Sequence, residues 1–123
     1  MNLKLLSKGN VLVFGDIILD RYISGSVDRV SPEAPVPVLK PSDEDIRLGG
    51  AANVAVNLSS LGSKVTLIGV TGKDVSSDQV RVLLEQNKIR NALSKSVNPT
   101  ISKLRFLAGQ QQLIRIDSEE EFT

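Results

Sequence analysis

Residues 49–62 read Gly-Gly-Ala-Ala-Asn-Val-Ala-Val-Asn-Leu-Ser-Ser-Leu-Gly, and they constrain the fold of this 123-residue chain more than any other segment. Small and apolar residues recur there at helical spacing, which predicts a helix that packs closely on a neighbouring layer. Gly62 is a typical stop at the carboxyl end of a helix. The predicted apolar stripe consists of Ala51, Val54, Ala55, Leu58 and Leu61.

Two short apolar runs lie on either side of this helix in the sequence. The length and branching of residues 11–14 predict a strand buried on both faces, as in a parallel sheet, and residues 64–70 predict a second buried strand. Residues 78–88 predict a second helix, with residues 76–78 as candidate N-caps. The order strand, helix, strand, helix is typical of an α/β fold with a parallel sheet.

Residues 17–48 do not fit a plain fold of this kind. They fill 32 positions between the first strand and the first helix, where such loops usually take about 2–6 residues. Residues 21–24 and 36–39 resemble strands, and prolines at positions 32, 35 and 37 exclude a helix and suit an edge strand or an extended arm. Residues 101–107 and 112–116 predict a hairpin. The extra strands are therefore predicted to lie outside the main sheet.

The composition excludes several classes of protein. Hydrophobic residues make up 41% of the chain and charged residues 24%, which is typical of a globular domain. The absence of Cys and His excludes disulfide scaffolds, Cys/His zinc sites and imidazole-dependent triads. The net charge of +1 offers no field for nucleic acid or an acidic membrane. The apolar runs are too short for a transmembrane helix, so we expect a cytoplasmic protein with neither partner.

Four residues form a candidate binding site. Asp16 directly follows the first predicted strand, where ligands bind in open α/β sheets. Gly49 and Gly50 lead into the helix, and Asn53 lies in its first turn. A carboxylate, a glycine backbone and an amide suit a ligand rich in hydroxyl groups. Spacing alone favours the structural alternative, in which these residues only form a turn and cap the helix.

Two other polar segments have simpler interpretations. Residues 69–74 do not form a nucleotide phosphate loop, because only two residues separate the glycines and Asp74 follows the Lys where a Ser or Thr is needed. A turn between a strand and a helix explains them better. Lys103, Arg105 and Arg115 lie on the predicted hairpin, where basic residues usually form a solvated face.

The segment from Gly49 to Gly72 resembles the first signature of the PfkB, or ribokinase-like, family of carbohydrate kinases. Gly49-Gly50, Asn53, Ala55, Gly62 and Gly72 meet every spacing of that pattern. Residues 15–22, 29–38, 99–105 and 111–117 further resemble one branch, the D-glycero-β-D-manno-heptose-7-phosphate kinases that form part of bifunctional ADP-heptose synthesis proteins. The resemblance covers nearly the whole chain, from about residue 10 to residue 122.

The resemblance implies a ribokinase-like (Rossmann-like) three-layer α/β fold with an additional β-lid, of which residues 1–123 form the N-terminal portion. Residues 10–16 and 49–95 correspond to the core, and residues 17–48 and 97–118 to the lid. The implied enzyme is a sugar kinase that transfers phosphate from ATP to the alcohol group of a heptose 7-phosphate, a precursor of the lipopolysaccharide core.

Site residues are implied in the same way. Asp16, Gly49, Gly50 and Asn53 correspond to residues that bind sugar hydroxyls in this family. Lys103 and Arg105 become candidates for the phosphate that the substrate already carries, although structural roles in the lid are equally open. The lid also implies a homodimer, or association with a C-terminal half.

The chain departs from the family in what it lacks. The family's catalytic Asp lies in a Gly-Ala-Gly-Asp type motif that is absent here, and its nucleotide site comes from later sequence. ATP and Mg²⁺ are implied for the full-length enzyme, with no metal ligand or nucleotide site in this chain. We therefore expect a truncated or split kinase that is inactive alone, with the apolar faces of its first two strands partly exposed.

Three hypotheses stay open at this point. The first is the N-terminal part of a heptose-phosphate kinase. The second is a non-catalytic protein that binds a sugar phosphate or forms oligomers through the lid strands. The third is a small independent α/β protein that binds an anion at Gly49-Gly50.

Overall fold

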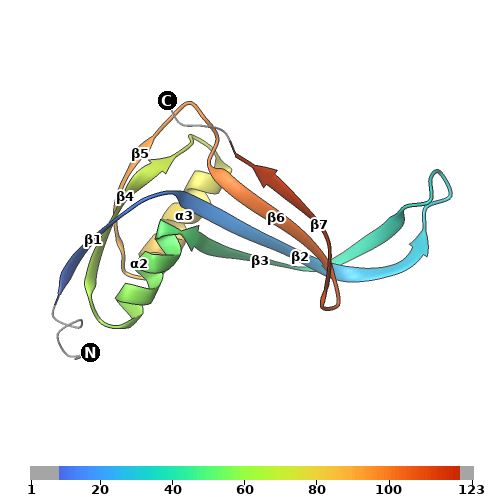
Figure 1. The fold of residues 1–123 in the computed structure, drawn as a ribbon, viewed down its shortest axis with the longest axis horizontal. Coiled ribbons are helices and arrows are strands. Elements are labelled where there is room, and N and C mark those ends of the chain that lie inside the picture. Colours follow the sequence, from blue (N-terminus) through green and yellow to red (C-terminus); the bar gives the residue numbers. More distant parts are fainter. Residues whose placement is uncertain (1–8, 120–123) are drawn as a thin grey trace.

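The computed structural model describes residues 9–119, which form two helices and two β-sheets (Figure 1). The elements are β1 (Asn10–Phe14), β2 (Ile17–Val30), β3 (Pro37–Gly50), α2 (Ala51–Ser60), β4 (Lys64–Thr71), α3 (Val75–Gln86), β5 (Arg90–Lys95), β6 (Ile101–Ala108) and β7 (Gln111–Ser118). The predicted α/β class is confirmed.

The first sheet is parallel, with the strand order β1-β4-β5. Val13 pairs with Leu67 across β1 and β4, and both side chains are buried. They belong to one apolar cluster with Ala52 and Ala55 of α2 and with Leu84 of α3. Each helix also contacts a strand of the second sheet, so the core lies between the two sheets (Figure 1).

The opposite face of the first sheet is open in the described part of the chain. Leu12 and Phe14 alternate with Val13 along β1, and they are 71% and 81% exposed. The prediction that this strand is buried on both faces is therefore wrong for residues 9–119, while the expected exposure of an apolar face is confirmed. The physical reason is that both helices contribute to the cluster on a single face.

The second sheet is mixed, with the strand order β3-β2-β6-β7. β2 and β3 form a long antiparallel hairpin whose far end projects away from the helices (Figure 1). β2 also pairs in parallel with β6, which forms the predicted hairpin with β7. Pro37 and Pro41 lie in β3, an edge strand, where a missing N–H leaves no unfilled position in the ladder. The predicted extra strands are confirmed.

Three local predictions need correction. α3 begins at Val75, and its N-cap is Asp74 rather than a residue of 76–78. β5 was not predicted, because its sequence is polar and its order depends on pairing with β4. The buried face of α2 centres on Ala52 and Ala55, whereas Val54 of the predicted stripe is half exposed.

Candidate functional site

Asp16 and the start of α2 lie in direct contact. The backbone N–H of Ala51 donates a hydrogen bond of 2.8 Å to the carbonyl oxygen of Asp16. Gly50 has φ of +60°, and a Cβ built on it would collide with that same carbonyl oxygen. Only glycine combines this backbone angle with such close approach. The turn between β1 and β2 is therefore brought against the first turn of α2.

The functional groups at this point face outward. Asp16, Gly50 and Asn53 are all exposed, and no side chain caps the amino end of α2. A small hollow of about 160 Å³ lies beside Asp16. It is lined by Phe14, Gly15, Asp16, Ile17, Gly69 and Val70. A carboxylate, an amide and a helix start thus share one accessible edge, which is the arrangement expected for a ligand rich in hydroxyl groups.

Gly49 differs from the other three predicted residues because it is buried. A Cβ at this position would collide with the carboxylate of Asp20 and approach the side chain of Ile18. Asp20 in turn accepts a hydrogen bond of 2.9 Å from Nη1 of Arg105. Gly49 therefore makes room for the Asp20–Arg105 ion pair, a contact that sequence reasoning did not identify.

Arg105 is held in place by its neighbours on the second sheet. The side chains of Arg105 and Asp20 are each only 18% exposed, and the hydrogen bond that the guanidinium donates to Asp20 raises the pKa of Arg105. The guanidinium carbons of Arg105 and Arg47 lie 5.1 and 5.3 Å from the ring centre of Tyr22. This geometry is typical of cation–π contacts. The charge of Arg105 is therefore already compensated within the sheet.

Lys103 lies nearer to Asp16 along the sheet than Arg105 does. In the β2–β6 register Lys103 pairs with Asp20, and Arg105 pairs with Tyr22. At the usual rise of a strand, these partners are roughly 13 and 20 Å along the chain from Asp16. Lys103 and Arg105 therefore lie on the same face of the sheet as Asp20. Arg105 is farther than Lys103 from the exposed residues around Asp16. No local sequence pattern signals the Asp20–Arg105 pair, because its two members lie 85 residues apart.

The turn after β4 is occupied by internal hydrogen bonds. Asp74 caps α3 through the N–H of Ser77, and it also accepts from the N–H and the hydroxyl of Thr100. Burial opposes the ionisation of Asp74, but these hydrogen bonds and the charge of Lys95 outweigh it and lower the pKa. The N–H of Gly72 donates to the Thr100 hydroxyl. The prediction that this turn is not a phosphate loop fits these contacts.

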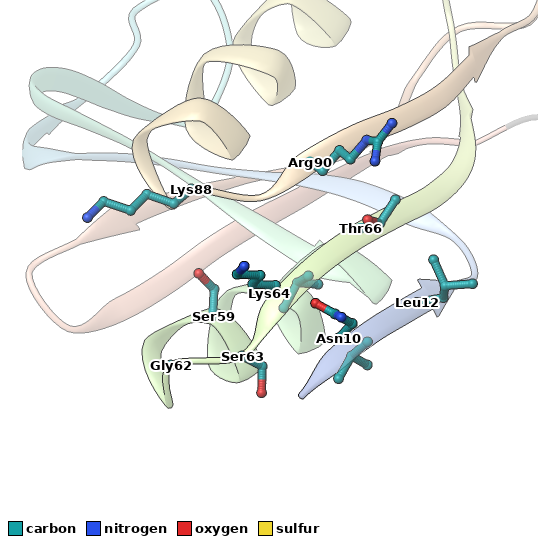
Figure 2. A pocket seen from close by; sticks show the side chains of 11 residues that line it. Asn10, Leu12, Ser59, Gly62, Ser63, Lys64, Thr66, Lys88 and Arg90 are labelled. Carbon is teal, nitrogen blue, oxygen red and sulfur yellow. The ribbon is translucent and has the colours of Figure 1, made fainter. Parts of the chain in front are cut away.

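A larger cavity than the hollow at Asp16 lies elsewhere. It has a volume of about 770 Å³ at the amino ends of β1 and β4, and its lining includes Lys64, Lys88 and Arg90 (Figure 2). In Figure 2 the charged ends of Lys88 and Arg90 extend to opposite sides, so they do not converge on one anion. Cations are favoured beside the carboxyl ends of helices, and both α2 and α3 end at this cavity. The helix ends therefore explain these basic residues without a bound anion. The accessible edge around Asp16 is therefore kept as the candidate site.

Two further features are absent from residues 9–119. No group of three or more acidic residues is arranged to hold a metal ion. Neither described helix has the length and apolar character needed to cross a membrane.

Known proteins resemble this chain over nearly its whole length. A family described as pfkB family carbohydrate kinase matches residues 8–122. The chain is 50% identical over 119 residues to the bifunctional protein HldE of Hydrogenovibrio crunogenus, covering 97% of this chain and 25% of that protein. It is 48% identical over 116 residues to a D-beta-D-heptose 7-phosphate kinase of Bordetella bronchiseptica, covering 94% of this chain and 37% of that protein.

Solved structures show the same fold. A carbohydrate kinase from Agrobacterium tumefaciens superimposes with a TM-score of 0.73 and 25% identity, over 89% of this chain and 35% of that one. Ribokinase from Giardia lamblia matches with a TM-score of 0.67 and 17% identity, over 90% of this chain and 36% of that one. The chain thus spans about a quarter to two fifths of the proteins that it matches.

Proposed function

Because the chain belongs to the pfkB family of carbohydrate kinases, we propose that it forms the sugar-binding part of an ATP-dependent kinase acting on a heptose 7-phosphate. The nearly 50% identity to a D-beta-D-heptose 7-phosphate kinase over most of this chain supports the substrate class. The cytoplasm, where ATP is available to a sugar kinase, is the compartment that fits this role.

The contact between Asp16 and the start of α2 is the observation that carries this proposal. A carboxylate accepts hydrogen bonds from neighbouring sugar hydroxyls, and Asn53 adds both a donor and an acceptor. Lys103 is the stronger candidate for the substrate phosphate, because Arg105 already pairs with Asp20. Gly49 acts through that ion pair, while Gly50 keeps the turn against α2.

The described residues do not fit the nucleotide side of the reaction. Gly72 and Asp74 use their polar groups on Thr100, and residues 9–119 contain no acidic cluster for Mg²⁺. No step through ATP or Mg²⁺ is therefore derived from these residues. The sequence-based expectation that the chain is inactive alone stays a prediction.

Asp16→Asn is expected to weaken binding of a heptose 7-phosphate by roughly 1–3 kcal/mol, the range for hydrogen bonds to charged groups. The substitution preserves shape but replaces an acceptor oxygen by a donor. Isothermal titration of the chain with phosphorylated and unphosphorylated heptose measures the loss. Both sugars should be affected equally, because Asp16 is assigned to hydroxyls that both carry.

Lys103→Ala serves as the matched comparison in that titration. It should weaken only the phosphorylated sugar, and added salt should reduce the difference because Lys103 is only half-buried. If Asp16→Asn binds both sugars as well as the parent does, Asp16 is only a turn residue. If the parent binds neither sugar, the proposed function is wrong.

The open face of the first sheet favours a second role, as an association surface. Phe14 and Leu12 expose large apolar side chains there, a feature that promotes self-association. Sedimentation velocity at tens of micromolar should show dimers or larger species, and Phe14→Ser should shift them toward the monomer. Val97→Ser is the control, because Val97 is 91% exposed but lies outside the sheet. A parent that sediments only as a compact monomer would contradict this role.

A further inference from the structure

We propose that Asp74 and Thr100 form a clasp that positions β6, and with it Lys103, relative to the sugar-binding edge at Asp16. The inference rests on the proposed function, in which Lys103 binds the substrate phosphate. It assigns a positioning role to two residues that lie outside the proposed contacts with the sugar.

Four hydrogen bonds make up the clasp. Oδ2 of Asp74 accepts from the N–H of Thr100 at 2.8 Å, and Oδ1 accepts from the Thr100 hydroxyl at 2.7 Å. The same hydroxyl accepts from the N–H of Gly72 at 2.9 Å. Oδ1 of Asp74 also accepts from the N–H of Ser77 at 2.8 Å, in the first turn of α3. One carboxylate therefore joins α3, the turn after β4 and the residue that precedes β6.

The clasp is closely packed, with Thr100 buried and Asp74 half-buried. Thr100 is only 2% exposed. A Cβ on Gly72 would lie 2.6 Å from the carbonyl oxygen of Asn98 and 2.7 Å from the N–H nitrogen of Thr100. The N–H of Ser96 donates a hydrogen bond of 2.8 Å to the carbonyl of Thr71. Residues 96–100 therefore lie directly against the turn that follows β4, with no room for a side chain between them.

The position of the clasp in the chain links it to Lys103. Thr100 immediately precedes β6, whose first residue, Ile101, pairs with Ile18. Lys103 follows two residues later and points to the same face as Ile101, at roughly 7 Å along the strand. β2 follows β1 directly after Asp16, and the clasp adds a further attachment of the second sheet to the core at the start of β6. This attachment helps to define the distance between Lys103 and Asp16.

The ionised form of Asp74 maintains this arrangement. As a carboxylate it can accept all three of its hydrogen bonds, whereas a proton on either oxygen would set a donor against the N–H of Thr100 or of Ser77, which can only donate. The hydrogen bonds from Thr100 and Ser77 outweigh the effect of burial and lower the pKa of Asp74, with a further contribution from Lys95.

Thr100→Val tests the clasp, because it preserves the shape of the side chain but removes the hydroxyl. We expect faster amide hydrogen exchange in β6 and a loss of about tenfold in affinity for heptose 7-phosphate, one lost hydrogen bond to a charged group. Affinity for unphosphorylated heptose should change by less than about twofold on the same scale. Thr100→Ser, which restores the hydroxyl, should recover both properties.

Thr66→Val is the matched control, since Thr66 lies on β4 away from the clasp and is half-buried. It should leave β6 exchange and the preference for the phosphorylated sugar unchanged. The proposal is overturned if the amides of β6 exchange at the same rate in Thr100→Val as in this control. It is also overturned if Thr100→Val weakens the binding of both sugars equally. If the parent binds neither sugar, the proposed function is wrong. The amide hydrogen exchange of β6 then decides by itself whether the clasp stabilises that strand.

Discussion

Gly50→Ala is expected to destabilise the chain by about 2–6 kcal/mol, from strained backbone and overpacking together. Gly50 has φ of +60° and ψ of −137°, a combination that residues with a side chain rarely adopt. The new Cβ would also collide with the carbonyl oxygen of Asp16, which accepts the hydrogen bond from Ala51. The substitution therefore strains the backbone and separates the two parts of the proposed sugar site.

Urea denaturation measures this loss, and Gly109→Ala is its matched control. Gly109 has φ of +61°, but a Cβ there meets no atom within 4 Å. It should cost only the backbone strain, about 1–3 kcal/mol. The difference between the variants then reports the contact with Asp16. Equal losses would show that this contact contributes nothing to stability, and that the turn can move away from α2.

Leu19→Ala is expected to cost about 2–5 kcal/mol, the usual range for a large buried aliphatic side chain. Leu19 lies on β2 and is fully buried, in the same cluster as Ala52 and Ala55 of α2. A cavity at this position would weaken the attachment of the second sheet to the helices. Thermal unfolding followed by circular dichroism gives the change in stability.

Leu12→Ala supplies the control for that cavity. Leu12 is 71% exposed on β1, so at a dilution where the chain is monomeric the same truncation should change stability by no more than about 0.5 kcal/mol. A loss as large as that of Leu19→Ala in the monomer would contradict the exposure of this face.

The local sequence pattern was sufficient to predict most of the described helices and strands. The apolar period of residues 49–62 predicted α2, and the branched residues of 64–70 predicted β4, because burial on one stripe or in a sheet leaves its period in the sequence. The prolines and alternating residues outside this pattern predicted the extra strands. β5 lacked such a signal, since Leu93 is its one residue that is not exposed. Pairing with β4 orders it instead.

For the candidate site, too, the sequence predicted one part and only the fold revealed the other. The places of Asp16, Gly50 and Asn53 in the fold were predictable, because a strand end, a turn and a helix start are local features. The hydrogen bond from Ala51 to Asp16 brings these segments together. Arg105 looked equivalent to Lys103 in the sequence. The fold separates them, because Asp20 pairs with Arg105 from a position 85 residues away.

The identities of the residues along this chain therefore determine its helices, most of its strands and the chemistry available at each turn, since these depend on neighbours a few positions apart. The partners of Asp20 and Asp74 come from β6 and the residue before it, and the open face of β1 depends on where both helices pack. Such contacts join distant segments, and they exist only once the sheets have formed, because long-range pairing leaves no period in the sequence.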